Sequence, residues 1–589
     1  MSASARVSAA YERIGEVKRP ELWITLRDPA EVLAEAEKLD RSAAAEPLPL
    51  AGMLLAVKDN IDIAGLPTTA GCPAYAYEAS ADAPVVARLR AAGAIVLGKT
   101  NLDQFATGLV GTRSPYGAVR DARRPEYVSG GSSSGSAVAV ALGIVDLALG
   151  TDTAGSGRVP AAFQGLVGVK PTRGIVPVAG VVPACRTLDC VTVFARDGAT
   201  AARALWVMAG PPGPATAPGP ATAPGPAAAA PGPAAALDRR WPPDAPLAAP
   251  PAPRIGIPAA GQLEHFLGPD ARRAFAAAAE RATERLEATL VEIDLAPFLE
   301  ASRLLYGGAY VAERHAAVGA FVDAHPEAVD PTVGGIIAAA GRHAATQFVR
   351  DAERLDGLKA ATAPVLAALD ALLLPTVPRQ PTIAEVAADP VGVNAELGPF
   401  TSFVNLLDLC AIAVPAGEAD GGQFGVSFIA PAFRDLVVAD LARRFLGEPP
   451  AAPAPAPGPG EPAGIPVLVI GAHRAGQPLH HQLASRGARG LGVVNTAPTY
   501  RMYALATEPP KPGLVRVSSG GVAIEGEVWA LPAAHLGSFL AALPAPMALG
   551  QVRLEDGRAV VGFLCEAVAL DGAPDISAHG SWLAYLAAR

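Results

Sequence analysis

The stretch YVSGGSSSGSAVAVALGIVDLALGTDTAGSGRVPAA, residues 127–162, decides the fold. Two clusters of serine and glycine, GGSSSGS and TDTAGSG, flank a smooth apolar segment. Good helix formers follow the first cluster, so it predicts a loop that leads into a helix. The apolar IVDLALG predicts a core strand that ends at the second cluster, where ligands commonly bind in α/β folds. We therefore expect the two clusters to lie at one site.

The rest of the chain predicts two domains separated by a proline-rich linker. Up to residue 210, apolar strands such as LLAVKDNIDI and AIVLGKTN alternate with helical stretches, which predicts a mixed sheet covered by helices. Helix-period patterns follow at 269–290 and 342–371. The first domain is expected to span 1–448 and to carry a Pro/Ala/Gly-rich insertion at 211–253. A Pro-rich linker (449–464) and an α+β domain (465–589) complete the chain.

Bulk composition excludes several classes of protein. The 589 residues are 51% hydrophobic and 17% charged, which is typical of globular chains. A net charge of −9 argues against nucleic acid or an anionic membrane as the main partner. There is no apolar run of about 18 residues and no signal-peptide core, so no membrane span or secretion is expected. The five cysteines form no CxxC pair, so we expect reduced thiols in a cytoplasmic protein.

The two clusters also carry the parts of a hydrolase. Ser156 could act as a nucleophile, and the successive N–H groups of Thr153, Ala154 and Gly155 could hold an oxyanion. No histidine precedes residue 265, so the base could be Lys58, a cation in an apolar strand where burial lowers its pKa. Each feature alone has a simpler interpretation, namely a solvated lysine and a flexible loop. A phosphate-binding loop is disfavoured because GxxxxGK[ST] is absent.

Taken together, LLAVKDNIDIAGLPTTAG, GGSSSGSAVAVALG and GTDTAGSGRVPAAFQGLVGVKPTRG resemble the amidase signature family. The resemblance implies a triad of serine, cis-serine and lysine that works without a cofactor. It makes Lys58 the base, Ser132 the bridging serine and Ser156 the nucleophile. The neighbouring Ser133 and Ser134 leave some ambiguity, and the register of GGSS favours Ser132, with Ser133 as a supporting hydrogen-bonding residue.

Within that family, TAGS followed by GRVPAAF resembles the allophanate hydrolases. The segment LLYGGAYVAERHAAV is similar to the part of those enzymes that grips the substrate's carboxylate, which implies this role for Tyr306 and Arg314. These two residues are eight positions apart, about two helical turns, so we expect them on one face. The loop NLDQFATGL resembles the family loop at the amide end and implies a contact from Gly108.

The C-terminal sequence resembles the domain appended to allophanate hydrolases, whose fold is similar to that of γ-glutamyl cyclotransferases. The resemblance implies that the amidase half releases ammonia from allophanate and leaves N-carboxycarbamate. The appended domain would then promote loss of carbon dioxide, with His473 as the candidate residue. His480 and His481, like His473 itself, could instead be solvated helix residues, and no histidine pair has a metal-binding spacing, so no metal is expected.

Other functions stay open at this point. The chain could hydrolyse another small amide, as malonamide- or indoleacetamide-type members of the family do, or serve as the amidase component of a tRNA amidotransferase. It could also be a non-catalytic binding protein, although Lys58, Ser132 and Ser156 are all present. The favoured interpretation implies allophanate as the small-molecule partner and a homodimer. Urea and cyanuric acid are both possible upstream sources.

Overall fold

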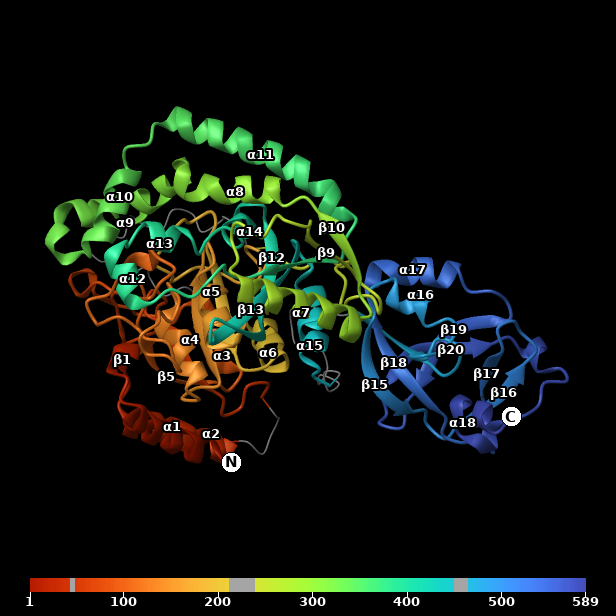
Figure 1. Ribbon diagram of the computed structural model, residues 1–589. Coiled ribbons are helices and arrows are strands. Elements are labelled where there is room, and N and C mark those ends of the chain that lie inside the picture. Colours follow the sequence, from red (N-terminus) through yellow and green to blue (C-terminus); the bar gives the residue numbers. More distant parts are fainter. Residues whose placement is uncertain (43–47, 211–238, 450–463) are drawn as a thin grey trace. The chain divides into compact units, whose positions relative to one another are not determined.

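The computed structural model describes residues 1–42, 48–210, 239–449 and 464–589 (Figure 1). They form two compact units, of which the first comprises Met1–Arg240 and Ala252–Pro449. Most of the expected insertion and of the expected linker lies outside the described residues. The described segment Trp241–Pro251, which the sequence places in the insertion, belongs to the second unit, where the Leu247 N–H donates to the Gly487 carbonyl at 2.9 Å.

The first unit is built on a mixed 11-stranded sheet in the order β1-β5-β2-β6-β8-β7-β12-β13-β11-β9-β10. Its strands are β1 (Trp23–Leu26), β2 (Leu54–Lys58), β5 (Ile95–Thr100), β6 (Leu147–Asp152), β7 (Val167–Lys170), β8 (Cys190–Ala195), β9 (Arg254–Pro258), β10 (Thr289–Ile293), β11 (Ala371–Pro375), β12 (Leu409–Ala419) and β13 (Gly422–Pro431). A separate two-stranded ribbon is formed by β3 (Pro67–Thr68) and β4 (Tyr77–Glu78).

Helices cover this sheet, as the alternating sequence pattern predicts (Figure 1). They are α1 (Ala3–Val17), α2 (Pro29–Ser42), α3 (Pro84–Ala91), α4 (Ser134–Ala141), α5 (Val159–Gln164), α6 (Gly198–Ala209), α7 (Pro269–Leu286), α8 (Ala296–Gly307), α9 (Ala312–Ala324), α10 (Pro331–Ala340), α11 (Ala345–Ala367), α12 (Ile383–Ala388), α13 (Gly392–Ala395), α14 (Ser402–Leu406) and α15 (Asp435–Leu446). The helix-period patterns at 269–290 and 342–371 correspond to α7 and α11, and each pattern ends in residues that begin a strand, β10 or β11.

The register of the sheet brings the two serine/glycine clusters to one edge. Strands β2 and β6 are parallel neighbours, with Leu55 opposite Leu147, so both strands end on the same side. Lys58 is the last residue of β2 and Asp152 the last of β6. Helix α4 starts at Ser134, inside the first cluster, and packs against both strands, and nearly all of its residues are buried. A helix this apolar on every side is stable only inside a core.

The second unit has a smaller five-stranded sheet in the order β15-β18-β14-β20-β19 and a two-stranded sheet, β16-β17. The elements are β14 (Ile465–Val469), α16 (His481–Ala484), β15 (Arg489–Asn495), β16 (Tyr500–Leu505), β17 (Lys511–Arg516), β18 (Glu525–Leu531), α17 (Ala533–Ala541), β19 (Met547–Arg553), β20 (Ala559–Cys565) and α18 (Trp582–Ala587). Its core contains buried side chains such as Met502 and Trp582. Among the described residues of the whole chain, no helix is both long and apolar enough to cross a bilayer.

Candidate active site

Lys58 lies with its side chain fully buried at the end of β2. Its Nζ donates to the Ser132 Oγ at 2.8 Å and to the Thr151 Oγ1 at 2.6 Å. Burial lowers the pKa of Lys58 from 10.5 to about 7, and the negative charges of Asp103 and Asp189 offset only part of that effect. An amine with this pKa is half neutral near pH 7, so it can serve as a base.

Ser132 is the member of the first cluster that contacts Lys58, and the peptide bond between Gly131 and Ser132 is cis. The two serines that follow have other partners. The Ser133 Oγ donates to the Thr151 carbonyl at 3.1 Å and accepts from the Thr151 N–H at 3.2 Å, while the Ser134 Oγ donates to the Asn101 carbonyl at 3.3 Å. Ser133 therefore ties the first cluster to β6, and Ser132 is the hydroxyl beside the amine.

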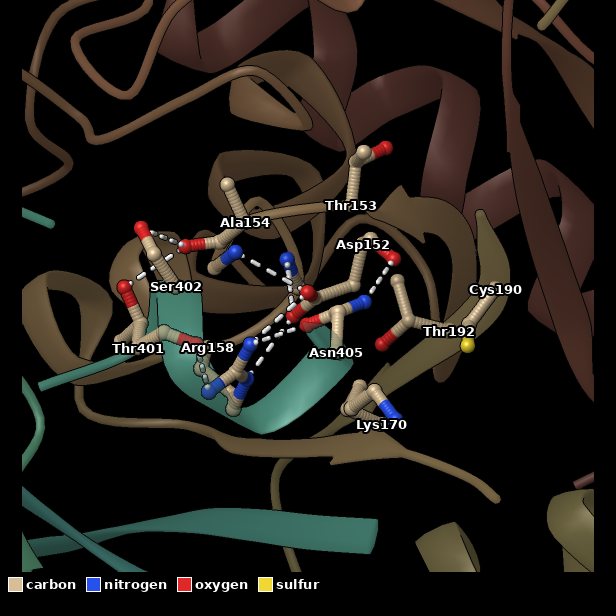
Figure 2. A network of polar contacts seen from close by, with 12 residues as sticks. Asp152, Thr153, Ala154, Arg158, Lys170, Cys190, Thr192, Thr401, Ser402 and Asn405 are labelled. Carbon is tan, nitrogen blue, oxygen red and sulfur yellow. Dashed lines mark hydrogen bonds and ion pairs between the residues drawn. The ribbon is translucent and has the colours of Figure 1, made fainter. Parts of the chain in front are cut away.

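The second cluster winds around the Asp152 carboxylate (Figure 2). Arg158 forms a bidentate pair with it at 2.9 Å from Nε and 2.9 Å from Nη2, and both side chains are fully buried. The N–H groups of Gly155 and Gly157 donate to the same carboxylate at 2.9 and 3.1 Å. Burial alone would raise the pKa of Asp152, but the Arg158 guanidinium outweighs it and holds the pKa below its usual value. A charged, fully paired carboxylate therefore fixes the loop.

A segment far away in the sequence holds the outer side of this loop (Figure 2). The Thr401 Oγ1 donates to the Ala154 carbonyl at 2.7 Å, and the Thr401 carbonyl accepts from Arg158 at 3.0 Å. Gly155 has a φ of +132°, and a Cβ there would lie 2.5 Å from the Thr401 Oγ1. Only glycine fits this position, because both the conformation and the space exclude a side chain.

These contacts alter the expected oxyanion hole. The sequence predicts donors from Thr153, Ala154 and Gly155, but the Gly155 N–H is already bound to Asp152. Within the described residues, the N–H groups of Thr153 and Ala154 have no protein acceptor. Ser156 follows in the same loop and is 4% exposed. The loop therefore presents a hydroxyl together with two unused N–H groups from positions 153 and 154.

Tyr306 and Arg314 meet, but not on one helix as their spacing predicts. Tyr306 is in α8 and Arg314 in α9, and Gly308 between them is extended. Two consecutive glycines disfavour continuation of the helix, and Asp351 accepts the N–H of Ala309 at 2.7 Å. The Arg314 Nη2 nevertheless donates to the Tyr306 hydroxyl at 3.4 Å.

Arg314 is a buried cation that has no counter-ion among the residues that the structure describes. It is 1% exposed, and its Nη1 donates to the Thr107 Oγ1 at 2.7 Å, while its Nε has no hydrogen-bond partner. No carboxylate of the described residues lies within ion-pair distance of it. Its positive charge is one of the influences that lower the pKa of Lys58, after burial. A desolvated guanidinium with an unused N–H is suited to bind an anion.

Gly108 lies beside Asp103 in the loop that also carries Thr107. A Cβ on Gly108 would lie 2.6 Å from the Asp103 Oδ2, so this position also requires glycine. Asp103 is fully buried and accepts the N–H groups of Gly111 and Arg113 at 3.0 Å each, and burial raises its pKa. This loop contacts two parts of the site. At one end the Asp103 N–H donates to the Ser132 carbonyl, and at the other the Thr107 hydroxyl accepts from the Arg314 guanidinium.

His473 lies in the second unit, in the loop after β14, where it lines a cavity of about 170 Å³. Its Nε2 is 3.0 Å from the Gln482 Oε1, and its ring stacks on Phe563 with centroids 4.8 Å apart. Burial lowers the pKa of His473, so the ring is neutral near pH 7. His480 packs its ring on Trp529 instead, and the His481 Nδ1 is 2.9 Å from the Pro478 carbonyl.

Comparison with known proteins agrees with this geometry. Residues 5–438 match the family described as Amidase. The chain belongs to the amidase family. Residues 465–587 of this amidase match the family described as Allophanate hydrolase C-terminal domain.

Three relatives illustrate how far the similarity extends. The allophanate hydrolase structure from Kluyveromyces lactis superposes with a TM-score of 0.83 at 38% identity, covering 100% of this amidase and 97% of that chain. The urea amidolyase of Saccharomyces cerevisiae is 41% identical over 96% of this amidase, which spans only 31% of that relative's length. The indoleacetamide hydrolase of Pseudomonas savastanoi is 46% identical over a shorter stretch, which covers 26% of this amidase and 34% of the relative.

Sequence reasoning missed three residues of this amidase's site: Thr151, Asp189 and Asn405. Thr151 shares the Lys58 amine with Ser132, and its place as the first residue of the second cluster is a usable signal. The Asp189 carboxylate is buried and accepts a hydrogen bond from the Thr153 hydroxyl. A single acidic residue within an apolar stretch is a sequence signal that could have indicated this role. The Asn405 Nδ2 donates to the Asp152 carbonyl at 2.8 Å, and nothing in its local sequence indicates this role.

Proposed function

We propose that this amidase is an allophanate hydrolase that releases ammonia from the terminal amide of allophanate. The observation that carries the proposal is the buried Arg314, which has no counter-ion among the described residues and donates to the Tyr306 hydroxyl. Its charge also contributes to the lowered pKa of Lys58. Allophanate carries a carboxylate two bonds from the amide carbonyl, so one small anion can reach both the guanidinium and the nucleophile. The similarity to the K. lactis allophanate hydrolase over the full length supports the same substrate.

The first half of the reaction uses the Lys58–Ser132 contact as a proton relay. Neutral Lys58 accepts the Ser132 proton across 2.8 Å, and Ser132 takes the proton of Ser156 as its oxygen attacks the amide carbonyl carbon. The oxyanion is held by the N–H groups of Thr153 and Ala154. The carbon–nitrogen bond then breaks, the relay returns the proton to the leaving nitrogen, and ammonia departs from an acyl-Ser156 intermediate.

Water completes the cycle by the same route. The relay removes a proton from the water as it attacks the acyl carbon, and Ser156 leaves with its proton restored. The product is N-carboxycarbamate, which carries two carboxylates on one nitrogen. Throughout both halves Arg314 and Tyr306 hold the distal carboxylate, so the carbonyl carbon stays in line with Ser156.

The second unit acts on this product. One carbon–nitrogen bond of N-carboxycarbamate breaks, carbon dioxide leaves, and the electron pair left on the nitrogen takes a proton to give carbamate. We place this step in the cavity beside His473, because the unit matches the allophanate hydrolase C-terminal domain and this cavity holds a neutral, buried imidazole.

The setting of the reaction is also part of the proposal. The similarity to urea amidolyase favours a place in urea degradation, in the cytoplasm. The resemblance to allophanate hydrolases further favours a homodimer. Size-exclusion chromatography with light scattering measures the mass in solution directly, and a monomer at micromolar concentration would refute the homodimer.

Ammonia release from allophanate, malonamide and urea by the purified protein tests the substrate. We expect rapid release from allophanate and none from urea. Turnover of a larger neutral amide without turnover of allophanate would overturn the proposal in favour of another small-amide amidase of this family.

The nucleophile is tested by Ser156→Ala, which should lower ammonia release from allophanate by at least about 10⁴-fold, because no acyl-enzyme can form. Ser134→Ala is the matched control: it removes a neighbouring serine hydroxyl that has no contact with Lys58, so most activity should remain. Retained turnover in Ser156→Ala would show that another group attacks the amide.

A further inference from the structure

The cavity beside His473 contains a second buried cation that has no counter-ion in the described part of the chain. Lys511, the first residue of β17, lines the cavity and is 6% exposed. Its Nζ makes one long contact, to the Pro509 carbonyl at 3.4 Å. Within the described residues, no carboxylate lies within ion-pair distance of this ammonium. A buried charge that the protein leaves unpaired is costly, and a bound anion would compensate it.

Local packing places this ammonium on the same wall as the imidazole. Gly471 lies so close to Pro512 that a Cβ on Gly471 would collide with the proline ring, which holds the His473 loop against the start of β17. The Lys511 charge is one of the influences that lower the pKa of His473, after burial. Glu508 also lines the cavity, but it is exposed and solvated.

The size of the cavity limits its ligand. A volume of about 170 Å³ is roughly five to six times the ~30 Å³ share of one water in the liquid. The lining combines the ammonium with Gln482 and with apolar walls from Met547 and Phe563. A small, compact anion fits these dimensions, whereas a nucleotide or a peptide does not.

We propose that Lys511 binds a carboxylate of a small dicarboxylate anion in the cavity beside His473. The identification of the natural ligand as N-carboxycarbamate rests on the proposed function, while the anion site itself does not. Lys511 is a binding residue in this role: its ammonium pairs with one carboxylate and holds the ligand's carbon–nitrogen bond next to the imidazole.

Malonate is the probe, because it has the two carboxylates of N-carboxycarbamate with CH₂ in place of NH and does not decompose. Calorimetric titration of the full chain counts malonate sites, since Arg314 provides a second cation in the first unit. Lys511→Gln keeps a donor for the Pro509 carbonyl but removes the charge, and it should weaken one site by about 10- to 100-fold. Lys511→Arg should restore it.

Arg516→Gln is the matched control, since it removes one positive charge from the other, exposed end of the same strand. We expect malonate binding to be unchanged in this variant. Wild-type malonate affinity in Lys511→Gln would overturn the proposal. A crystal structure of the wild-type chain with malonate tests the proposal without any variant. A cavity beside His473 that holds no malonate would also overturn the proposal.

The products formed from allophanate distinguish a failure of this inference from a failure of the proposed function. In wild-type protein, ¹³C-labelled allophanate should give bicarbonate with little N-carboxycarbamate visible by NMR. In Lys511→Gln the first ammonia should appear at the wild-type rate while N-carboxycarbamate accumulates at least about tenfold. If the wild-type chain releases no ammonia from allophanate, the proposed function fails, yet a Lys511-dependent malonate site would still stand.

Discussion

Lys58 illustrates how a residue acquires its chemistry from its position. On a protein surface this side chain would be a solvated cation, but at the end of β2 it is fully buried between two hydroxyls. Its pKa falls to about 7 because burial penalises the charged form. Arg314 is buried to the same degree and keeps its charge, because a guanidinium does not lose its proton in proteins. One buried cation is therefore suited to act as a base and the other to bind an anion.

The pH dependence of ammonia release follows from the Lys58 pKa. Below about pH 7 the folded enzyme carries protonated Lys58, which cannot accept the Ser132 proton, so kcat/KM should fall tenfold per pH unit. Above that pH the rate should level off. Lys359→Ala, which removes an exposed lysine, should leave the profile unchanged. A rising limb whose inflection lies at pH 9 or above would contradict the lowered pKa of Lys58.

In the proposed function, Arg314 gives the selectivity for an anionic amide. Arg314→Gln should raise KM for allophanate by about 100-fold, because the carboxylate loses a charge-assisted hydrogen-bond partner, while turnover of neutral malonamide should change little. Arg303→Gln removes an exposed arginine from neighbouring α8 and should affect neither substrate. Equal losses on allophanate and malonamide would indicate that Arg314 only supports the fold.

At the scale of elements, the active site is a meeting of chain segments that the sheet aligns. The parallel pairing of β2 with β6 brings the base and the nucleophile loop to one edge. Thr401, which precedes α14, and Asn405, near the end of α14, then hold the loop from outside as a clamp. The break between α8 and α9 lets Arg314 reach Tyr306 from a second helix. No one element carries the site.

Asn405 tests the clamp. Asn405→Ala removes an acceptor from Arg158 and a donor from two buried carbonyls, so we expect it to lower the free energy of unfolding by roughly 1–3 kcal/mol. The nucleophile loop should loosen, and kcat should fall with little change in KM. Thermal melts and steady-state kinetics measure both effects. Gln262→Ala removes a partly exposed amide of the same unit and serves as the control. An unaltered melting temperature in Asn405→Ala would contradict the clamp.

At the scale of the whole molecule, the two candidate sites lie in two units that have separate cores. Each unit has its own sheet, and the candidate groups are distributed between them: the triad in the first and His473 with Lys511 in the second. The chain thus joins an amidase domain to a unit that matches the allophanate hydrolase C-terminal domain and has a candidate site of its own.

Truncation after residue 449 tests this division. The shortened chain should still release the first ammonia from allophanate, because the first unit keeps its sheet and its site, and N-carboxycarbamate should persist longer. This truncation also strips Trp241–Pro251 of its packing partners, so His473→Ala in the full chain is the matched variant. Unchanged carbon dioxide release in both would count against a role for the second unit.

The sequence alone determined the elements and the chemical groups of the site. Short apolar strands that alternate with helical stretches predict the sheet. The two serine/glycine clusters, each next to an apolar segment, predict that Lys58, Ser132 and Ser156 belong to one site. These are local properties, since periodicity and glycine content depend on near neighbours in the chain. The C-terminal unit is predicted by the same signals and by its resemblance to a known domain.

Only the tertiary structure decided which groups are free to react. The Gly155 N–H is bound to Asp152, so the expected oxyanion hole is reduced to Thr153 and Ala154. Asn405 and Lys511 acquire their roles from segments distant in the sequence. The reason is physical: a pKa, an unused N–H or an unpaired charge depends on burial and on every neighbouring group, and long-range packing alone sets both.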